Sequence, residues 1–144
     1  MKLCTALILI FLTFAVNAAG QITYGEKRVV FTEEKRINLT TQRDTSYERF
    51  TPTLADIDSA DAFFQKHLIS RNKNTALKIQ DYYRQYVGLK TKDKKCVFIN
   101  AACKKPDDFL ENTFLVFGGG DCYLQGDVDI NNKKVFNFYS NAPM

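Results

Sequence analysis

The spacing of apolar residues changes once along this chain, near residue 79. From Ile79 to Tyr139 apolar side chains recur mostly at every second position, the period of a strand with one buried face. Residues 54–68 instead show spacings of three and four, the period of a helix with one apolar stripe. Because that stripe needs a surface to cover, the pattern predicts an α+β fold in which one N-terminal helix packs on a curved antiparallel meander of four to five strands.

The helix is expected to begin at Pro52 and to end at Asn72-Lys73-Asn74. Acidic residues lie in its early turns and Lys66, His67 and Arg71 in its late turns, which suits the helix dipole at both ends. His67 is the chain's single histidine, and we interpret it as a helix-end cation rather than a catalytic base. The predicted stripe is Leu54, Ile57, Ala60 or Asp61, Phe64 and Leu68.

The strands are separated by turn-like segments. The expected turns are Thr91–Lys94, Lys104–Asp108, Gly118–Gly120 and Asn131-Asn132. The strands between them are expected at residues 79–89, 95–103, 113–117, 122–130 and 133–140.

The first nineteen residues have the pattern of a secretory signal peptide. Lys2 precedes an uncharged apolar run, and small residues around Ala18 and Ala19 suit cleavage after either position. A membrane anchor is the alternative, but the run is shorter than the ~20 residues that a spanning helix needs. Cleavage leaves about 125 residues, enough for one domain with a core, and lowers the net charge of +4 by one. We expect a secreted or periplasmic protein with no membrane association after cleavage.

Residues 20–50 are polar and irregular and are expected to form an N-terminal arm, followed by a single domain over 51–144. Arg28–Phe31 is suited to a short edge strand or hairpin, and a loosely held arm is the alternative. Asn38-Leu39-Thr40 matches a glycosylation acceptor, which matters in a eukaryotic secretory pathway.

Three cysteines follow the signal segment, so one disulfide and one remaining thiol are expected in an oxidising compartment. Cys103 lies on the same side of its expected strand as Val97 and Ile99. Cys122 lies on the same side of its expected strand as the apolar residues of 124–130. Both therefore point to the core, whereas Cys96 points away. Strand parity predicts a Cys103–Cys122 disulfide, and three reduced thiols remain an alternative.

Catalytic and metal chemistry find little support in the sequence. Asp127, Asp129 and Asn131 resemble the start of a calcium loop, but apolar residues separate them and Phe138 occupies the position of the bidentate glutamate. Gly118–Gly120 lacks the Lys-Ser/Thr of a phosphate loop. We therefore expect no enzyme activity, no metal and no cofactor, and the mild charge does not indicate nucleic acid.

The row Tyr82, Arg84 and Tyr86 is the strongest candidate for a binding surface. These residues belong to the expected strand 79–89 and lie on the face opposite the one assigned to the core. Tyrosine and arginine are enriched at protein interfaces. The alternative is a sheet face half covered by the N-terminal arm. A ligand pocket between helix and sheet would instead use Asp81, with Tyr83 and Gln85, as inward polar residues.

The segments Tyr82–Gly88, Ile99–Cys103 and Gly118–Tyr123, with the closing Asn141-Ala142, resemble a family of small exported proteins of Bacteroidetes-type bacteria. That family has an R-Q-Y-x-G strand, an N-x-x-C strand and a G-G-x-C-Y turn. The resemblance covers residues 80–144 and departs at Pro143. It implies export and no assigned activity.

The expected architecture is also similar to cystatin-like and NTF2-like folds. Gln85-Tyr86-Val87-Gly88 resembles the Q-x-V-x-G loop of cystatins but is one residue short, and the chain has no tryptophan for a second inhibitory loop. The sequence thus favours an exported, non-enzymatic binding or structural module with a protein partner. A cystatin-like inhibitor or immunity-type protein, and an NTF2-like ligand binder or enzyme, are the alternatives.

Overall fold

The computed structural model describes residues 16–17, 20–39 and 47–143, and these form an α+β fold with a mostly antiparallel open sheet. The predicted signal segment therefore lies largely outside the described residues. The helices are α1 (Leu54–Ile69) and α2 (Lys73–Lys78). The strands are β1 (Val16–Asn17), β2 (Gln21–Thr23), β3 (Arg28–Phe31), β4 (Glu48–Phe50), β5 (Tyr83–Lys90), β6 (Lys95–Ala102), β7 (Tyr123–Asp129) and β8 (Lys134–Ser140).

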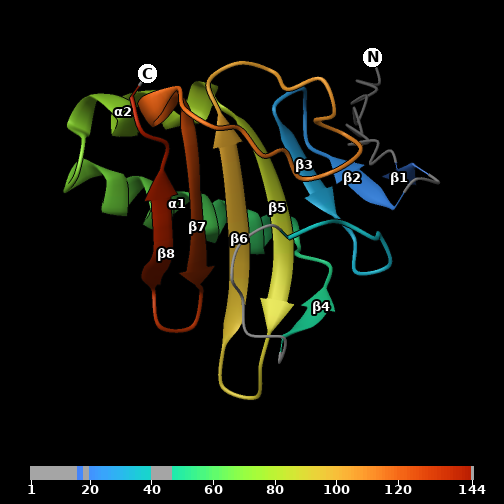
Figure 1. Ribbon diagram of the computed structural model, residues 1–144. Helices are drawn as coiled ribbons and strands as arrows, with labels where there is room; N and C mark the ends of the chain where they lie inside the picture. Colours follow the sequence, from blue (N-terminus) through green and yellow to red (C-terminus); the bar gives the residue numbers. More distant parts are fainter. Residues whose placement is uncertain (1–15, 18–19, 40–46, 144) are drawn as a thin grey trace, which may run out of the picture.

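The strand order in the sheet is β1-β2-β3-β5-β6-β7-β8 (Figure 1). β5 to β8 form the antiparallel meander that the period-two pattern predicted. The segment expected to be an arm supplies further strands: β3 pairs with β5 in parallel, and β4 pairs with the remaining length of the same edge of β5. The sheet is therefore wider than the predicted four to five strands.

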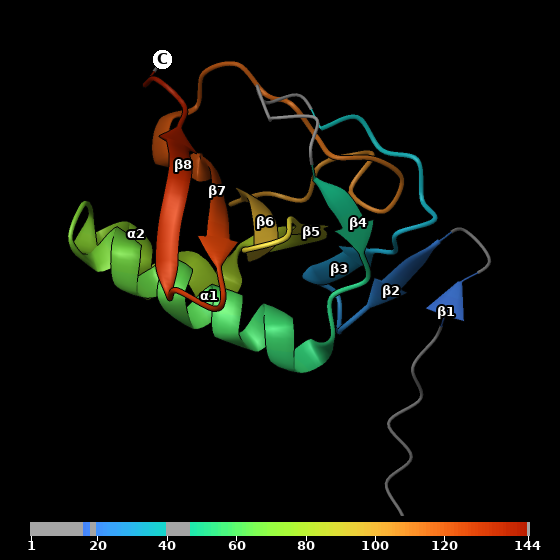
Figure 2. The same cartoon turned by 90° about the horizontal axis from the view of Figure 1, so that it is seen from below.

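The long helix forms where the sequence predicted it. Thr53 accepts a hydrogen bond from the backbone N–H of Asp56, and the Asp56 carboxylate accepts one from the N–H of Thr53. This reciprocal capping box satisfies two N–H groups that a helix start leaves unpaired. α1 lies across one face of the sheet (Figure 2). Its buried residues are those of the predicted stripe: Ile57, Ala60, Asp61, Phe64 and Leu68.

Residues 73–81 are helical rather than the beginning of a strand. Asn72, expected to end the first helix, caps α2 by accepting a hydrogen bond from the N–H of Thr75. A short 3-10 helix (Ile79–Asp81) follows, and β5 begins at Tyr83. The expected strand start at Ile79 is wrong because a local side-chain cap outweighs the alternation of apolar residues. In the part of the chain that the structure describes, no helix has the length and hydrophobicity to cross a membrane.

The second face of the sheet is also buried, and a segment without regular structure covers it. The expected strand at 113–117 is wrong: residues 103–119 form turns and extended chain instead. Phe109 and Phe114 of this segment pack on the sheet beside Val87, Phe98 and neighbouring residues. The side of the sheet away from α1 in Figure 2 carries these loops. The fold thus has three layers: helix, sheet and covering segment.

Two buried amides hold the covering segment on the sheet. Gln85 of β5 and Asn100 of β6 are cross-strand partners, and Nδ2 of Asn100 donates to Oε1 of Gln85 at 3.0 Å. Nε2 of Gln85 donates to the carbonyl oxygens of Phe109 (2.8 Å) and Asn112 (2.7 Å). Nδ2 of Asn100 donates to the carbonyl of Phe114 at 3.0 Å. These bonds satisfy backbone carbonyls of the covering segment that would otherwise have been paired in the hydrogen-bond ladder of a strand.

The predicted disulfide is present, although its surroundings differ from the prediction. Cys103 and Cys122 are bonded, with Cα atoms 4.8 Å apart, and the backbone N–H of Cys103 donates to the carbonyl of Cys122. The bond lies at the end of the β6–β7 ladder, where Cys103 is exposed, so it does not point into the core. It closes the base of the covering segment. Cys96 is a buried thiol in the core of the second face.

We predict that Gln85→Ala destabilises the protein by about 3 kcal/mol, because two buried carbonyls and the Asn100 amide lose their partner. Gln125→Ala is the control: Gln125 flanks Asn100 on β7, is half-buried and makes no side-chain hydrogen bond within the described residues. Urea unfolding of both variants measures the difference. Equal stability of the two variants would contradict the role given to Gln85.

Candidate functional site

The residues predicted as an exposed binding row are buried. Tyr82, Arg84 and Tyr86 are 8%, 4% and 0% exposed and point to the helix side of the sheet. The prediction is wrong because both faces of β5 are covered. Val87 and Leu89 belong to the second face rather than to the helix side, so apolar parity did not identify which face carries α1. Tyr82 donates a hydrogen bond to the carbonyl of Asp121 at 2.8 Å.

Arg84 and Tyr86 belong to a buried ionic cluster with Asp61 of α1. Nη1 of Arg84 lies 2.7 Å from Oδ2 of Asp61, and the Tyr86 hydroxyl donates to the same carboxylate at 2.9 Å. Burial raises the pKa of the Asp61 carboxyl, and Arg84 and Tyr86 partly offset this rise. Burial and the neighbouring Asp61 raise the pKa of Tyr86 well above its ordinary value, so its hydroxyl stays protonated.

The cluster connects α1 to two strands of the sheet. Arg28 reaches it from β3, with Nη1 3.9 Å from Asp61 and 2.6 Å from Asp58. Its groups bind one another, and the space beneath α1 is filled by Phe64, Ile99 and other side chains of the core. The cluster therefore fixes α1 over β5.

Asp81, predicted as an inward pocket residue, is exposed. Its side chain is 82% accessible and lies 3.9 Å from Nζ of Lys27 at the surface. It falls in the 3-10 helix before β5, so the strand alternation assumed for it does not apply. Tyr83 and Gln85, named with it, point to the second face of the sheet.

His67 has the helix-end position expected of it. It lies in the last turn of α1, its ring centroid is 5.0 Å from that of Phe138, and Nε of Arg71 donates to its Nε2 at 2.9 Å. Partial burial, and then Arg71, lower the pKa of His67. The described residues contain no group of three or more His, Cys, Asp or Glu side chains that could hold a metal.

The sequence interpretation missed a lysine-lined cleft at one end of the sheet. The β5–β6 turn and the β7–β8 turn lie at this end (Figure 1). Between the first of these turns, Asn131 of the second and the end of β4 lies a cleft of about 370 Å³. Four of its eight lining residues are lysines, against one acidic residue: Phe50, Lys90, Thr91, Lys92, Asp93, Lys94, Lys95 and Asn131. We call this the lysine cleft.

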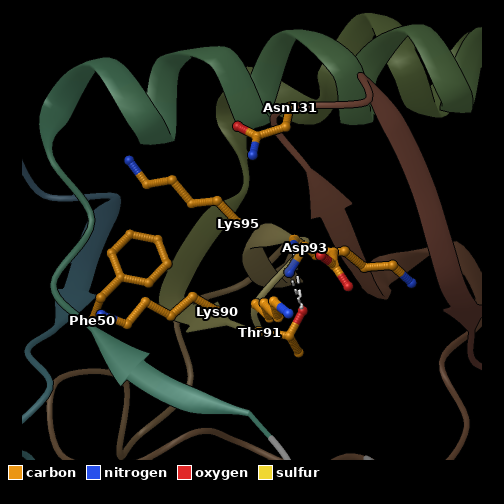
Figure 3. Close-up of a pocket in the computed structure, with 8 residues that line it drawn as sticks. Phe50, Lys90, Thr91, Asp93, Lys95 and Asn131 are labelled. Atoms are coloured by element: carbon orange, nitrogen blue, oxygen red, sulfur yellow. Dashed lines mark hydrogen bonds between the residues drawn. The ribbon is translucent and has the colours of Figure 1, made fainter.

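An aromatic ring forms part of the lysine cleft. Figure 3 shows the side chains of Lys90 and Lys95 on either side of the Phe50 ring in that view, and Nζ of Lys95 lies 5.1 Å from the ring centroid. Phe50 comes this close to β5 because residue 88 is glycine: a Cβ there would lie 2.2 Å from the Phe50 carbonyl oxygen. The glycine therefore positions the ring.

Some of the lysines in the cleft are paired and others are not. Nζ of Lys95 lies 2.7 Å from Asp56 at the start of α1, and Nζ of Lys90 lies 3.7 Å from Glu48. Lys92 and Lys94 are exposed and form no ion pair within the described residues. Lys94 lies over the ring of Phe136 at 5.4 Å.

Lys94 also borders a second cleft, of about 400 Å³, on the other side of the turn. That cleft is lined by Lys134 and also by Asp129, and Lys133 is exposed in the adjacent turn. The arrangement concentrates ammonium groups around two shallow clefts, each with one phenylalanine. Chemically it is able to bind anions, and it offers no nucleophile–base pair.

We predict that Arg84→Ala lowers the free energy of unfolding by about 3–5 kcal/mol, because it leaves the Asp61 carboxylate buried without its cation. The double variant Asp61→Leu/Arg84→Met removes both charges and should be more stable than the single variant. Urea unfolding at neutral pH measures both. A single variant within about 1 kcal/mol of the wild type would refute the role of the ion pair.

We predict a pH-dependent contribution from Asp56. Burial raises the pKa of Asp56, but hydrogen bonds from Lys95 and Thr53 outweigh it and hold the pKa below its ordinary value. The stabilisation is therefore complete above the unfolded pKa of about 4 and is lost as pH falls through the lower folded pKa. Asp56→Ala should be less stable than wild type by about 1 kcal/mol at pH 6, with the difference shrinking below about pH 3. A difference that stays constant down to about pH 2 would contradict this assignment.

Comparison with protein-family models, with curated proteins and with solved structures gave no match for this chain. The resemblance to small exported proteins, and the similarity to cystatin-like and NTF2-like folds, therefore stay predictions. The segment that suggested a cystatin loop, Gln85–Gly88, lies buried in β5. The surface of the protein is therefore the remaining source of information on what it binds.

Proposed function

We propose that this protein is an exported, non-enzymatic binding module that binds an anionic ligand at the lysine cleft. The supporting observation is the composition of the cleft: four lysines and a phenylalanine line it with one acidic residue. Lys90 and Lys95 are paired with Glu48 and Asp56 beside the cleft, so Lys92 and Lys94 are the ammonium groups left for a ligand. Asp93, the acidic residue, donates its backbone N–H to Thr91 within the turn and is itself exposed.

Export is supported by two independent features. The first nineteen residues have the charge and apolar pattern of a signal peptide, and the Cys103–Cys122 disulfide is compatible with an oxidising compartment outside the cytoplasm. The disulfide stabilises the fold by about 3 kcal/mol on the chain-entropy model. In the cytoplasm, where thiols are kept reduced, such a disulfide would not persist.

The ligand class follows from the type and exposure of the cations. Lysine ammonium groups act as point charges on flexible stems and do not impose the planar two-bond geometry of arginine. The exposed lysines extend from Lys90 on the first turn to Lys134 on the second, so they suit several anionic groups spread along one molecule. We therefore assign a multivalent anion, carrying phosphate, sulfate or carboxylate groups, rather than a single small ion.

We predict that inorganic polyphosphate binds the purified protein and that Lys92→Ala/Lys94→Ala weakens binding about tenfold, since two exposed ion pairs are lost. Titration calorimetry at about 50 and 200 mM salt should show weaker binding at the higher salt. Orthophosphate should bind much more weakly than polyphosphate.

Lys73→Ala/Lys78→Ala is the matched control, because it removes the same charge from exposed positions on α2, away from the β5–β6 and β7–β8 turns (Figure 1). An equal loss of affinity in both double variants would show general charge attraction and refute the assigned cleft. Absence of polyphosphate binding at about 50 mM salt would also refute the proposal.

A further inference from the structure

Phe117 is an aromatic side chain displayed at the surface. It lies in the covering segment and is 86% exposed, and Leu115, two residues earlier, is 50% exposed. Isolated exposed apolar residues are common and need no explanation. Phe117 differs because the chain on both sides of it is held in place.

Asn141, near the C-terminus, holds the backbone around Phe117. Its Nδ2 donates to the carbonyl of Val116 at 2.6 Å and to the carbonyl of Gly118 at 2.7 Å, and the residue is 7% exposed. The N–H of Gly120 donates to the carbonyl of Ala142 at 3.0 Å, and the disulfide at Cys122 follows. Phe117 is therefore presented on a pre-organised loop, which lowers the entropy lost when it binds a partner.

A cleft of about 400 Å³ lies on the same segment. Its apolar lining consists of Phe114, Leu115, Val116 and Tyr123, with Pro106 at its rim. Leu115 thus belongs both to the exposed apolar pair and to the cleft wall. An exposed aromatic ring and a cleft with both apolar and charged walls are therefore carried by neighbouring residues of the covering segment.

The charged residues of this cleft are balanced in sign, and the described part of the chain offers them no ion-pair partner. Lys104, Lys105, Asp107 and Asp108 line it, and they form no ion pairs with one another or with other described residues. Two cations and two anions give the patch no net charge. A partner of one strong charge sign is therefore not favoured, whereas a partner with the same alternation is complementary.

We propose that this surface, made of Phe117 and the cleft lined by Leu115, Val116 and Tyr123, binds a second copy of this chain as a two-fold symmetric dimer. A two-fold contact requires a self-complementary patch in which each copy supplies both knob and socket. Phe117 of each copy enters the cleft of the other, and Lys104 and Lys105 of each face Asp107 and Asp108 of the other. The surface consists of one cleft and one exposed ring, so we expect a weak, reversible dimer.

Sedimentation equilibrium of the purified protein from about 1 to 200 µM tests the proposal. We expect a reversible monomer–dimer equilibrium, and we expect Phe117→Ser to raise the dissociation constant by at least about tenfold because both copies lose an aromatic anchor. Leu77→Ser is the matched control: Leu77 is 68% exposed on α2, and its loss should leave the equilibrium unchanged. Circular dichroism verifies that both variants are folded.

Charge exchange supplies a second test. Lys104→Glu/Lys105→Glu places four acidic residues in each patch and should abolish the dimer at low salt. Adding Asp107→Lys/Asp108→Lys restores the alternation with opposite sign and should recover the dimer. Three results would overturn the proposal. The first is a monomer at every concentration, and the second is a dimer that Phe117→Ser does not weaken. The third is a dimer that the double variant abolishes but the fourfold variant does not restore.

Discussion

The segment that covers the second face of the sheet has no ladder of its own, so its backbone polar groups depend on partners from the sheet. Gln85 and Asn100, paired across β5 and β6, provide these partners for Phe109, Asn112 and Phe114. The disulfide closes the base of the segment, and Nδ2 of Asn141 holds its far end. Asn112 and Thr113 extend the same arrangement to the backbone of Asn38 in the N-terminal region. Burial of both faces of the sheet in a chain with one long helix rests on this arrangement.

Burial of both faces also determines which side chains remain for recognition. On the helix side, even charged groups are used internally: the Asp61 carboxylate accepts hydrogen bonds from Arg84 and Tyr86 beneath α1. Such a cluster is costly to desolvate and gives modest net stability, but it requires one register of helix against sheet. The side chains left for other molecules include those of the lysine cleft, at one end of the strands, and Phe117 in the covering segment.

The sequence predicted the elements better than it predicted their surroundings. The start of α1 was readable because an apolar stripe and Pro52 agree, whereas its end at Ile69 precedes the expected Asn72-Lys73-Asn74. The Cys103–Cys122 pairing was predicted correctly, although the two residues meet at the end of paired strands and not in the core. The row from Tyr82 to Tyr86 was misplaced because strand parity shows which residues share a face, not which face carries the helix. Arg84 has its partner 23 positions away, so no local signal marked it as buried. The lysine cleft was missed because Lys90–Lys95 reads as a turn, and only the strand pairing brings it beside Asn131.

The positions of the two surfaces give the proposed dimer a consequence for binding. β6 runs from the lysine cleft at Lys95 to the disulfide end beyond Ala102, so the two surfaces lie at opposite ends of the central strands (Figure 1). A two-fold dimer formed through Phe117 with its axis across the strands would direct its two lysine clefts away from each other. One long polyanion could then reach both clefts only if it spanned the whole dimer, whereas two separate anionic chains would be bridged readily. Because linked sites gain avidity only when the ligand spans them, the geometry favours cross-linking over wrapping.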